Sequence, residues 1–296
     1  MTFFKNYISV IFAVIILTNA GINAQLPPSD LYLCKINLTQ KNIVSGIPVF
    51  LNEFNTDGYN NQPFFRDYNI VFITSVKDDD KTEIYQLDLE KKEFFRFTAT
   101  EKISEFSPQI NPDAKTLNVV RIEEDGKTQT LWSYPLDRSD FGYNVIPFLT
   151  NVGYYTWISQ EKVALFLVDT VPSLAVADVK TGKVFKIMEN IGRSLKEKNG
   201  SLYFTQKKEN NQHAVKKYDL VEQTIQHVFD LPEMVEDFDI LGDGQFLFGK
   251  GSQLFMYNPE KPSGTYEVSD LSAYGIKNIK RIATARDRLI LVDQKL

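Results

Sequence analysis

Cysteine and histidine are the scarcest reactive residues in this chain of 296 residues, which has one cysteine, Cys34, and two histidines, His213 and His227. A single cysteine excludes an intrachain disulfide. Two histidines and one thiol also exclude a three-histidine zinc site and a thiolate cluster. We therefore predict that Cys34 is a buried strand residue and that both histidines are structural.

Concentrated positive charge is missing as well. Lysine and arginine total 33 residues against 38 aspartates and glutamates, which gives a net charge of −5, and no stretch is strongly basic. A nucleic-acid-binding surface needs clustered cations to replace the counterions of the phosphate backbone. We therefore predict that the protein has no nucleic-acid partner.

Only one long apolar run is present, the ten residues Ile8–Leu17. It is too short to span a bilayer comfortably. Lys5 precedes it and small residues follow it, which is typical of a secretory signal. We predict a signal peptide over residues 1–24, with an uncleaved membrane anchor as the alternative. The mature domain, residues 25–296, is then exported to the periplasm or the extracellular space and has no transmembrane segment after cleavage.

Motifs for nucleotide and acyl chemistry are incomplete. The stretch GDGQFLFGKGS, residues 242–252, has the glycine and lysine spacing of a P-loop, but Gly251 stands where that motif has Ser or Thr. The residues between Gly244 and Gly249 are apolar and strand-forming, so we interpret the stretch as a strand flanked by two turns. No G-x-S-x-G nucleophile motif is present in the sequence.

Candidate metal ligands are also few. The stretch DFDILGDG, residues 237–244, has the acidic character of a calcium loop, but Asp239 and Asp243 are four residues apart and not at alternate positions. We interpret it as a solvated turn. The stretch KDDDK, residues 77–81, is interpreted as a charged hairpin tip. We predict no cofactor, with calcium as the alternative.

Aromatic residues and a repeated pattern are what the sequence has in abundance. Its 22 Phe and 14 Tyr favour sheets. An apolar residue is followed four positions later by Asp, Asn or Pro, and then by a short turn and a second strand. Asp and Asn suit the start of a turn because their side chains bond to nearby backbone amides. The pattern begins at residues 33, 84, 131, 174, 215 and 254, at spacings of 51, 47, 43, 41 and 39 residues.

Two further strands precede most of these hairpins. One is strongly apolar, and the other is weaker, as in residues 61–65 and 154–158. Each period of about 45 residues therefore holds four short antiparallel strands, which is the content of a propeller blade. Helical periodicity is absent, and NIGRSLKEKNG, residues 190–200, has room for one helical turn at most.

The two ends of the sequence complete one blade between them. The chain ends just after RLILVD, residues 288–293, where another hairpin is due, and the missing hairpin is the one that begins at Leu33. We therefore predict an all-β, six-bladed β-propeller with four antiparallel strands per blade, whose N-terminal strands complete the C-terminal blade. Such closure leaves no exposed sheet edge at the joint. An all-β sandwich with accidental spacing is the alternative.

Two blades carry a more specific pattern. PQINPDAKTL, residues 108–117, resembles the P-x-F-S-P-D-G-K-x-L signature of TolB-like, WD40-like propeller repeats, with Ala114 in place of the usual Gly. PFFRDYNIVF, residues 63–72, is a looser copy. The resemblance implies a six-bladed propeller in the bacterial envelope or outside the cell. It implies little about chemistry, because this architecture hosts scaffolds, binding proteins, lactonases and protease accessory domains.

Loops between the predicted blades supply the candidate site. Three of them, residues 52–62, 151–157 and 270–278, are rich in aromatic and amide side chains. Aromatic residues exposed on one face usually indicate binding. Packing between blades is the alternative for each residue, above all for the tryptophan. The candidate binding residues are Phe54, Tyr59, Tyr154, Tyr155, Trp157 and Tyr274.

The function predicted from these observations is that of an exported, non-catalytic propeller that binds a protein, peptide or glycan partner on one face. The alternative is a metal-dependent lactonase or esterase, with a divalent ion held in the central channel by Glu, Asn and Asp side chains. A structural subunit of an envelope or secretion assembly is a third alternative. No catalytic residue and no set of metal ligands is assigned.

Overall fold

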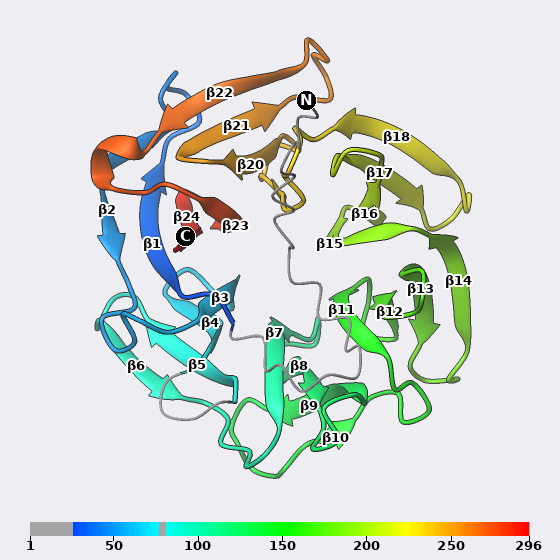
Figure 1. The fold of residues 1–296 in the computed structure, drawn as a ribbon. Coiled ribbons are helices and arrows are strands. Elements are labelled where there is room, and N and C mark those ends of the chain that lie inside the picture. The colour runs from blue at the N-terminus through cyan, green and yellow to red at the C-terminus, as the bar shows by residue number, and fades with distance from the viewer. Residues whose placement is uncertain (1–25, 77–80, 296) are drawn as a thin grey trace, which may run out of the picture.

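The computed structural model of the protein describes residues 26–76 and 81–295. Their strands form six four-stranded antiparallel sheets, which are arranged as blades around a central axis (Figure 1). The predicted six-bladed β-propeller is therefore confirmed. The predicted signal peptide over residues 1–24 lies outside the described residues, as does most of the KDDDK segment.

Five blades are continuous in sequence, and their strands run from the axis outward in chain order. Blade 1 contains β3 (Asn60–Phe65), β4 (Ile70–Ser75), β5 (Glu83–Asp88) and β6 (Glu93–Arg96), and blade 2 contains β7 (Ser104–Ile110), β8 (Thr116–Ile122), β9 (Gln129–Pro135) and β10 (Tyr143–Asn144). Blade 3 contains β11 (Val152–Trp157), β12 (Lys162–Leu167), β13 (Ser173–Asp178) and β14 (Val184–Glu189). Blade 4 contains β15 (Ile191–Lys198), β16 (Ser201–Lys207), β17 (His213–Asp219) and β18 (Ile225–Asp230), and blade 5 contains β19 (Asp239–Ile240), β20 (Phe246–Lys250), β21 (Gln253–Tyr257) and β22 (Thr265–Asp270).

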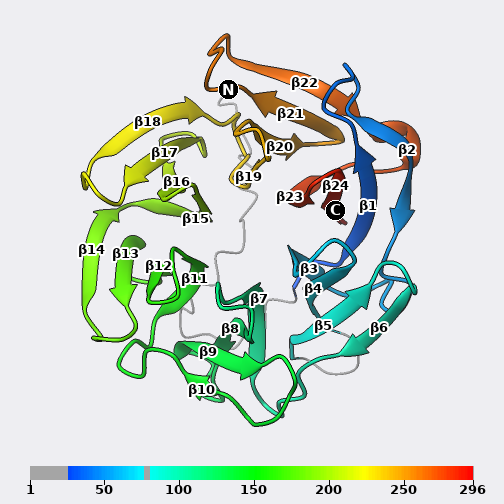
Figure 2. The same cartoon turned by 180° about the vertical axis from the view of Figure 1, so that it is seen from behind.

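Blade 6 is assembled from segments far apart in the sequence. Its strands are β23 (Ile279–Ala285), β24 (Arg288–Gln294), β1 (Ser29–Ile36) and β2 (Val44–Phe50). β1 pairs with β24 in antiparallel fashion over seven consecutive residue pairs. Seen from the opposite side, blade 6 fills the gap between blades 5 and 1 (Figure 2). The predicted closure of the ring is confirmed.

The outer hairpins turn where the repeated pattern predicts. Asp88, Asp178 and Asp219 each end the third strand of a blade, and one carboxylate oxygen of each accepts two backbone N–H groups of the turn at 2.8–3.1 Å. These backbone hydrogen bonds hold the pKa of each carboxyl below its usual value. The repeated aspartate therefore fixes the same turn in three blades.

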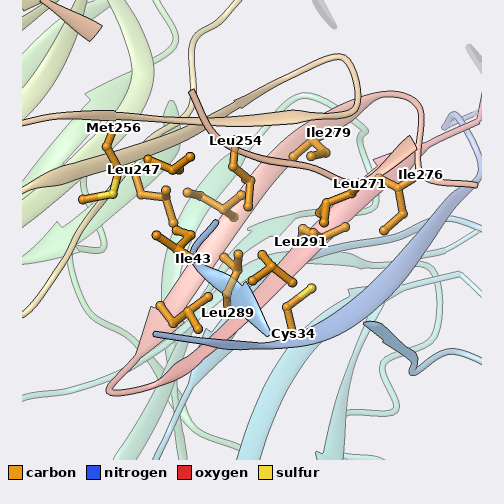
Figure 3. Packing of buried hydrophobic residues seen from close by; sticks show 14 of the residues in the cluster. Cys34, Ile43, Leu247, Leu254, Met256, Leu271, Ile276, Ile279, Leu289 and Leu291 are labelled. Atoms are coloured by element: carbon orange, nitrogen blue, oxygen red, sulfur yellow. The ribbon is translucent and has the colours of Figure 1, made fainter. Parts of the chain in front are cut away.

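The hydrophobic core of the described residues is divided into six clusters, one at each junction between neighbouring blades. At the junction of blades 5 and 6, Leu254 and Met256 face Leu289 and Leu291 (Figure 3). Cys34 belongs to the same cluster and is 1% exposed, as predicted. Burial raises the pKa of its thiol to about 12.

The P-loop-like stretch is a strand between two glycine turns, as the sequence predicts. Gly244 and Gly251 both adopt left-handed backbone conformations, with φ of 86° and 60°, and β20 lies between them. The next element is strand β21, where a P-loop has a helix. Lys250 is exposed at the tip of this hairpin.

The sequence allowed at most one helical turn over residues 190–200, and the structure has a strand there. Residues 190–200 do not form a helical turn, because most of them belong to β15, the innermost strand of blade 4. Ile191 and Leu195 are buried against blade 3. A bulge between these two residues breaks the regular alternation of buried and exposed side chains, which hid the strand from the sequence pattern.

Replacement of Leu31 tests how much the closing strand contributes. Leu31 in β1 is fully buried between blades 6 and 1, so Leu31→Ala is expected to lower the free energy of unfolding by about 2–5 kcal/mol. Leu38→Ala is the matched control, because Leu38 is exposed in the loop after β1, and it is expected to change stability by less than about 0.5 kcal/mol. Urea unfolding measures both; equal effects would contradict the closure of the core by β1.

Ala114 gives a second test, at the turn where similar repeats have Gly. Its φ is 58°, a left-handed conformation that costs an L-residue about 1 kcal/mol. Ala114→Gly is therefore expected to raise the free energy of unfolding by about 0.5–1 kcal/mol. Ala273→Gly, at an exposed position of the short helix η1 (Ser272–Tyr274), is the control and is expected to be neutral or destabilising. Thermal unfolding measures both variants. A lower melting temperature for Ala114→Gly than for the wild type would contradict the proposed backbone strain at Ala114.

Candidate functional site

The innermost strands of the blades surround a narrow channel. Residues from all six blades line a cavity of about 70 Å³ within it. Several lining residues are each the third residue of an innermost strand, and so lie at one level of the channel: Gln62 in β3, Tyr154 in β11, Arg193 in β15 and Arg281 in β23. The candidate site is built at this level.

Two arginines and two tyrosines meet there, and we call Tyr59, Tyr154, Arg193 and Arg281 the channel cluster. The guanidinium carbon of Arg281 lies 5.7 Å from the centroid of the Tyr154 ring. Burial, and then the neighbouring Tyr154, raise the pKa of Tyr59, so its hydroxyl stays protonated. The side chain of Arg193 stays 47% exposed and that of Arg281 24% exposed, so solvent reaches both cations inside the channel.

Glu236 holds Arg193 in place. Its Oε2 accepts hydrogen bonds from Nε and Nη2 of Arg193 at 3.0 and 2.7 Å, and its Oε1 accepts the backbone N–H of Arg193. Although burial alone would raise the pKa of Glu236, the guanidinium lowers it to about 2. Glu236 is therefore an anion at neutral pH, and it fixes the orientation of one cation of the channel cluster.

Asp237 and Asp239 form hydrogen bonds and an ion pair with neighbouring blades. The interpretation of residues 237–244 as a solvated turn is therefore wrong for these two carboxylates. Asp237 accepts hydrogen bonds from the Ser194 hydroxyl at 3.0 Å and from the backbone N–H of Ile282 at 2.9 Å. Asp239 accepts the backbone N–H and the hydroxyl of Thr284 at 2.7 and 2.8 Å, and it pairs with a lysine of β15 at 3.1 Å. These carboxylates therefore connect blade 5 to blades 4 and 6.

His213 lies against the segment that precedes blade 5. Its Nδ1 lies 3.1 Å from the carbonyl oxygen of Val235, and its Nε2 lies 3.9 Å from Oε1 of Glu236. Burial lowers the pKa of His213 despite the nearby carboxylate, so the ring is neutral at pH 7. The histidine therefore supports the segment that carries Glu236.

Amide side chains connect the other side of the channel. Gln62 and Ser107 sit at bulges of β3 and β7, with left-handed φ angles of 53° and 56°. The Gln62 side-chain oxygen accepts the backbone N–H of Ser107 at 2.7 Å, and Gln109 donates to the carbonyl oxygen of Tyr155 at 2.7 Å. These hydrogen bonds link blades 1, 2 and 3 beside the cavity.

The six predicted aromatic residues have different positions. Tyr59 and Tyr154 belong to the channel cluster, and Tyr274 is exposed in η1. Phe54 stacks on Tyr85 and Phe94, with centroid separations of 5.3 and 4.3 Å.

The last two aromatic residues pack inside the fold. Tyr154, Tyr155 and Trp157 all lie on strand β11, as the weak strand pattern of residues 154–158 predicts, and not in a loop between blades. Tyr155 and Trp157 are buried, and the indole N–H of Trp157 donates to Asn118 at 3.1 Å. Trp157 therefore packs between blades, which was the alternative to a binding role for this residue.

The charged members of the site were missed by sequence reasoning. Arg193 and Glu236 lie in segments without a regular apolar pattern, and Arg281 follows the mostly polar stretch KNIK, residues 277–280. The sequence signal for these residues is their position in the blade, because Tyr154, Arg193 and Arg281 are each the third residue of an innermost strand. Alignment of the blades on their innermost strands would have placed them together.

The same ring of blades occurs in solved structures. The putative TolB of Agrobacterium tumefaciens matches with a TM-score of 0.64 and 10% identity, over 92% of this chain and 99% of that chain. The chain has a TolB-like propeller fold. A chain of a nidogen–laminin complex matches this TolB-like propeller with a TM-score of 0.62 and 9% identity, over 90% of this chain and 98% of that one.

A third neighbour of the TolB-like propeller is the oligogalacturonate lyase of Vibrio parahaemolyticus, with a TM-score of 0.51 and 12% identity, over 82% of this chain and 85% of that chain. Identities this low show the fold alone. No protein-family model matches the sequence, and no curated protein matches it significantly. In the described part of the propeller, no helix has the length and apolar character needed to cross a membrane.

The link between Glu236 and Arg193 can be tested by its pH dependence. Because the folded pKa of Glu236 is depressed, its contribution to stability is present above about pH 4.5 and is lost as the pH falls toward 2. Glu236→Gln is expected to lower the free energy of unfolding by about 2 kcal/mol at pH 7, and the difference should shrink below about pH 4.5.

Glu209→Gln, at an exposed position between β16 and β17 of the blade that carries Arg193, is the matched control and is expected to be neutral. Urea unfolding between pH 2 and pH 7 gives the comparison. A difference between wild type and Glu236→Gln that does not depend on pH would show that the ion pair does not stabilise the channel cluster.

Proposed function

We propose that this TolB-like propeller is an exported, non-catalytic protein that binds an acidic segment of a protein or peptide at the channel cluster. The observation that carries the proposal is that Arg193 and Arg281 keep exposed surface in the channel cavity, where the Arg281 guanidinium lies 5.7 Å from the centroid of the Tyr154 ring. Guanidinium groups recognise carboxylates through paired N–H donors. A tyrosine ring adds apolar contact at low entropic cost.

The rigidity of the channel cluster supports this function. Tyr154, Arg193 and Arg281 lie on strands of three different blades, and Glu236 fixes the Arg193 side chain. A site built on strands keeps its geometry without a ligand, so little conformational freedom is lost when a partner binds. The arrangement therefore suits recognition of a carboxylate by groups that are already in position.

The state of the channel carboxylates favours binding over metal-dependent catalysis. A lactonase or esterase of the predicted kind needs carboxylates that are available to a divalent ion. Asp237 and Asp239 accept hydrogen bonds from neighbouring blades, and Glu236 is paired with Arg193. Coordination of a metal ion by these groups would disrupt the links that connect blades 4, 5 and 6.

Fluorescence anisotropy with labelled peptide pools tests the proposal. One pool contains Asp and Glu at random positions, and the matched pool contains Asn and Gln at the same positions. The acidic pool is expected to bind at least about tenfold more tightly. Arg281→Gln and Tyr154→Ala are each expected to weaken this binding by about tenfold. The first removes a contact with the carboxylate of the peptide, and the second removes the apolar contact that the tyrosine ring makes with the peptide.

Tyr274→Ala is the matched control, since Tyr274 is exposed in η1 and does not line the channel cavity. Melting temperatures of all variants check that the fold is kept. Equal binding of the two pools, or binding that neither channel variant weakens, refutes the proposal. Binding of oligogalacturonate and of neither peptide pool would replace the peptide partner by an acidic glycan.

A further inference from the structure

A second cavity lies at the joint between blades 6 and 1. Its volume is about 300 Å³, and it shares no lining residue with the channel cavity. Residues of β1, β2, β24 and the turn between β3 and β4 line it. This joint brings strands from both ends of the described chain together (Figures 1 and 2).

A large bulge in β2 shapes one wall of the cavity. Leu33 pairs with Val49 and Lys35 pairs with Ser45, so β2 has two more residues than β1 over this interval. Ile47, within the bulge, is 78% exposed and lines the cavity. Because the bulge interrupts the outer edge of β2, it disfavours pairing of that edge with an extended chain. The cavity therefore suits a small molecule better than an added strand.

Two cations, Lys35 and Arg288, line the cavity, and a third, Arg286, lies over the ring of the lining residue Tyr68. Lys35 and Arg288 are directly opposite each other on neighbouring strands, an arrangement in which like charges repel. Arg286 and Arg288 lie over the Tyr68 ring, at 5.7 and 3.7 Å from its centroid. Over residues 26–76 and 81–295, no carboxylate lies within ion-pair distance of these three cations. In a protein of net charge −5, this uncompensated cluster points to a bound anion.

The Arg288 guanidinium is held so that one edge can receive a ligand. Its Nη1 donates to the Tyr68 carbonyl oxygen at 2.7 Å and to the Asn69 side-chain oxygen at 3.0 Å. No acceptor among the described residues bonds to its Nε and Nη2, and neither atom is sealed from solvent. Two parallel N–H donors on one edge match the two oxygens of a carboxylate.

We propose that this cavity binds a small amphipathic carboxylate, with its alkyl chain against Ile47 and Val49 and its carboxylate between Lys35 and Arg288. The apolar bulge and the paired cations face the two parts of such a molecule. A volume of about 300 Å³ lies at the lower end of the range for small-molecule sites, which suits an alkyl chain of moderate length. This site is independent of the channel cluster and of its partner.

Isothermal titration calorimetry with octanoate tests the proposal, with octanol and acetate as probes of the tail alone and of the head group alone. Octanoate is expected to bind with a Kd at or below about 1 mM, and octanol and acetate at least about tenfold more weakly. Lys35→Gln is expected to weaken octanoate binding by about tenfold. Ile47→Ser should weaken it by about threefold, because less apolar surface is buried.

Lys250→Gln is the control for loss of one positive charge, since Lys250 is exposed on a hairpin of blade 5 and does not line this cavity. Tyr154→Ala should leave octanoate binding unchanged, which separates this site from the channel cluster. Absence of octanoate binding, equal binding of octanoate and octanol, or unchanged binding to Lys35→Gln would each overturn the proposal. Because Lys35 and Ile47 are exposed, both variants are expected to fold, and circular dichroism confirms it.

Discussion

Each blade of this propeller can bury its two faces only against its two neighbours. Strand β4 shows the constraint in three consecutive residues: Val71 and Ile73 pack toward blade 6, and Phe72 packs toward blade 2. Successive side chains of a strand point to opposite faces, so a second strand of a blade must be apolar at nearly every position. The ring has to close, because an open one would leave two apolar faces exposed to water.

The polar groups that hold the inner ends of the blades together also determine what the channel can bind. The carboxylates of Glu236, Asp237 and Asp239 are directed at neighbouring blades, where they accept hydrogen bonds. Arg193 and Arg281 retain exposed surface in the channel. The same acids are the partners of the channel cations, because Glu236 pairs with Arg193 at 2.7 Å and Asp237 with Arg281 at 3.8 Å.

The architecture could be predicted because it follows from local signals. Hairpin aspartates such as Asp88 bond to amides within three residues along the chain, so the sequence shows them directly. The channel site could not be predicted in the same way. Arg193 and Arg281 are 88 residues apart, and only the curvature of the ring brings them together. Bulges such as the one before Tyr154 also shift side chains between the two faces of a strand, so the sequence pattern does not show which residues face the channel.

The pairing of β1 with β24 has a consequence for the order of events during synthesis. Residues 29–36 leave the ribosome early, but their partner strand, residues 288–294, is made more than 250 residues later. Without β24, β1 can pair only with β2, and its buried side chains Leu31 and Cys34 lack the core residues Leu289 and Ile290 that pack beside them. Contacts of such long sequence separation form late and slowly. Blade 6 therefore cannot close until residues 288–294 are present, and a chain without them would leave one edge of β1 exposed.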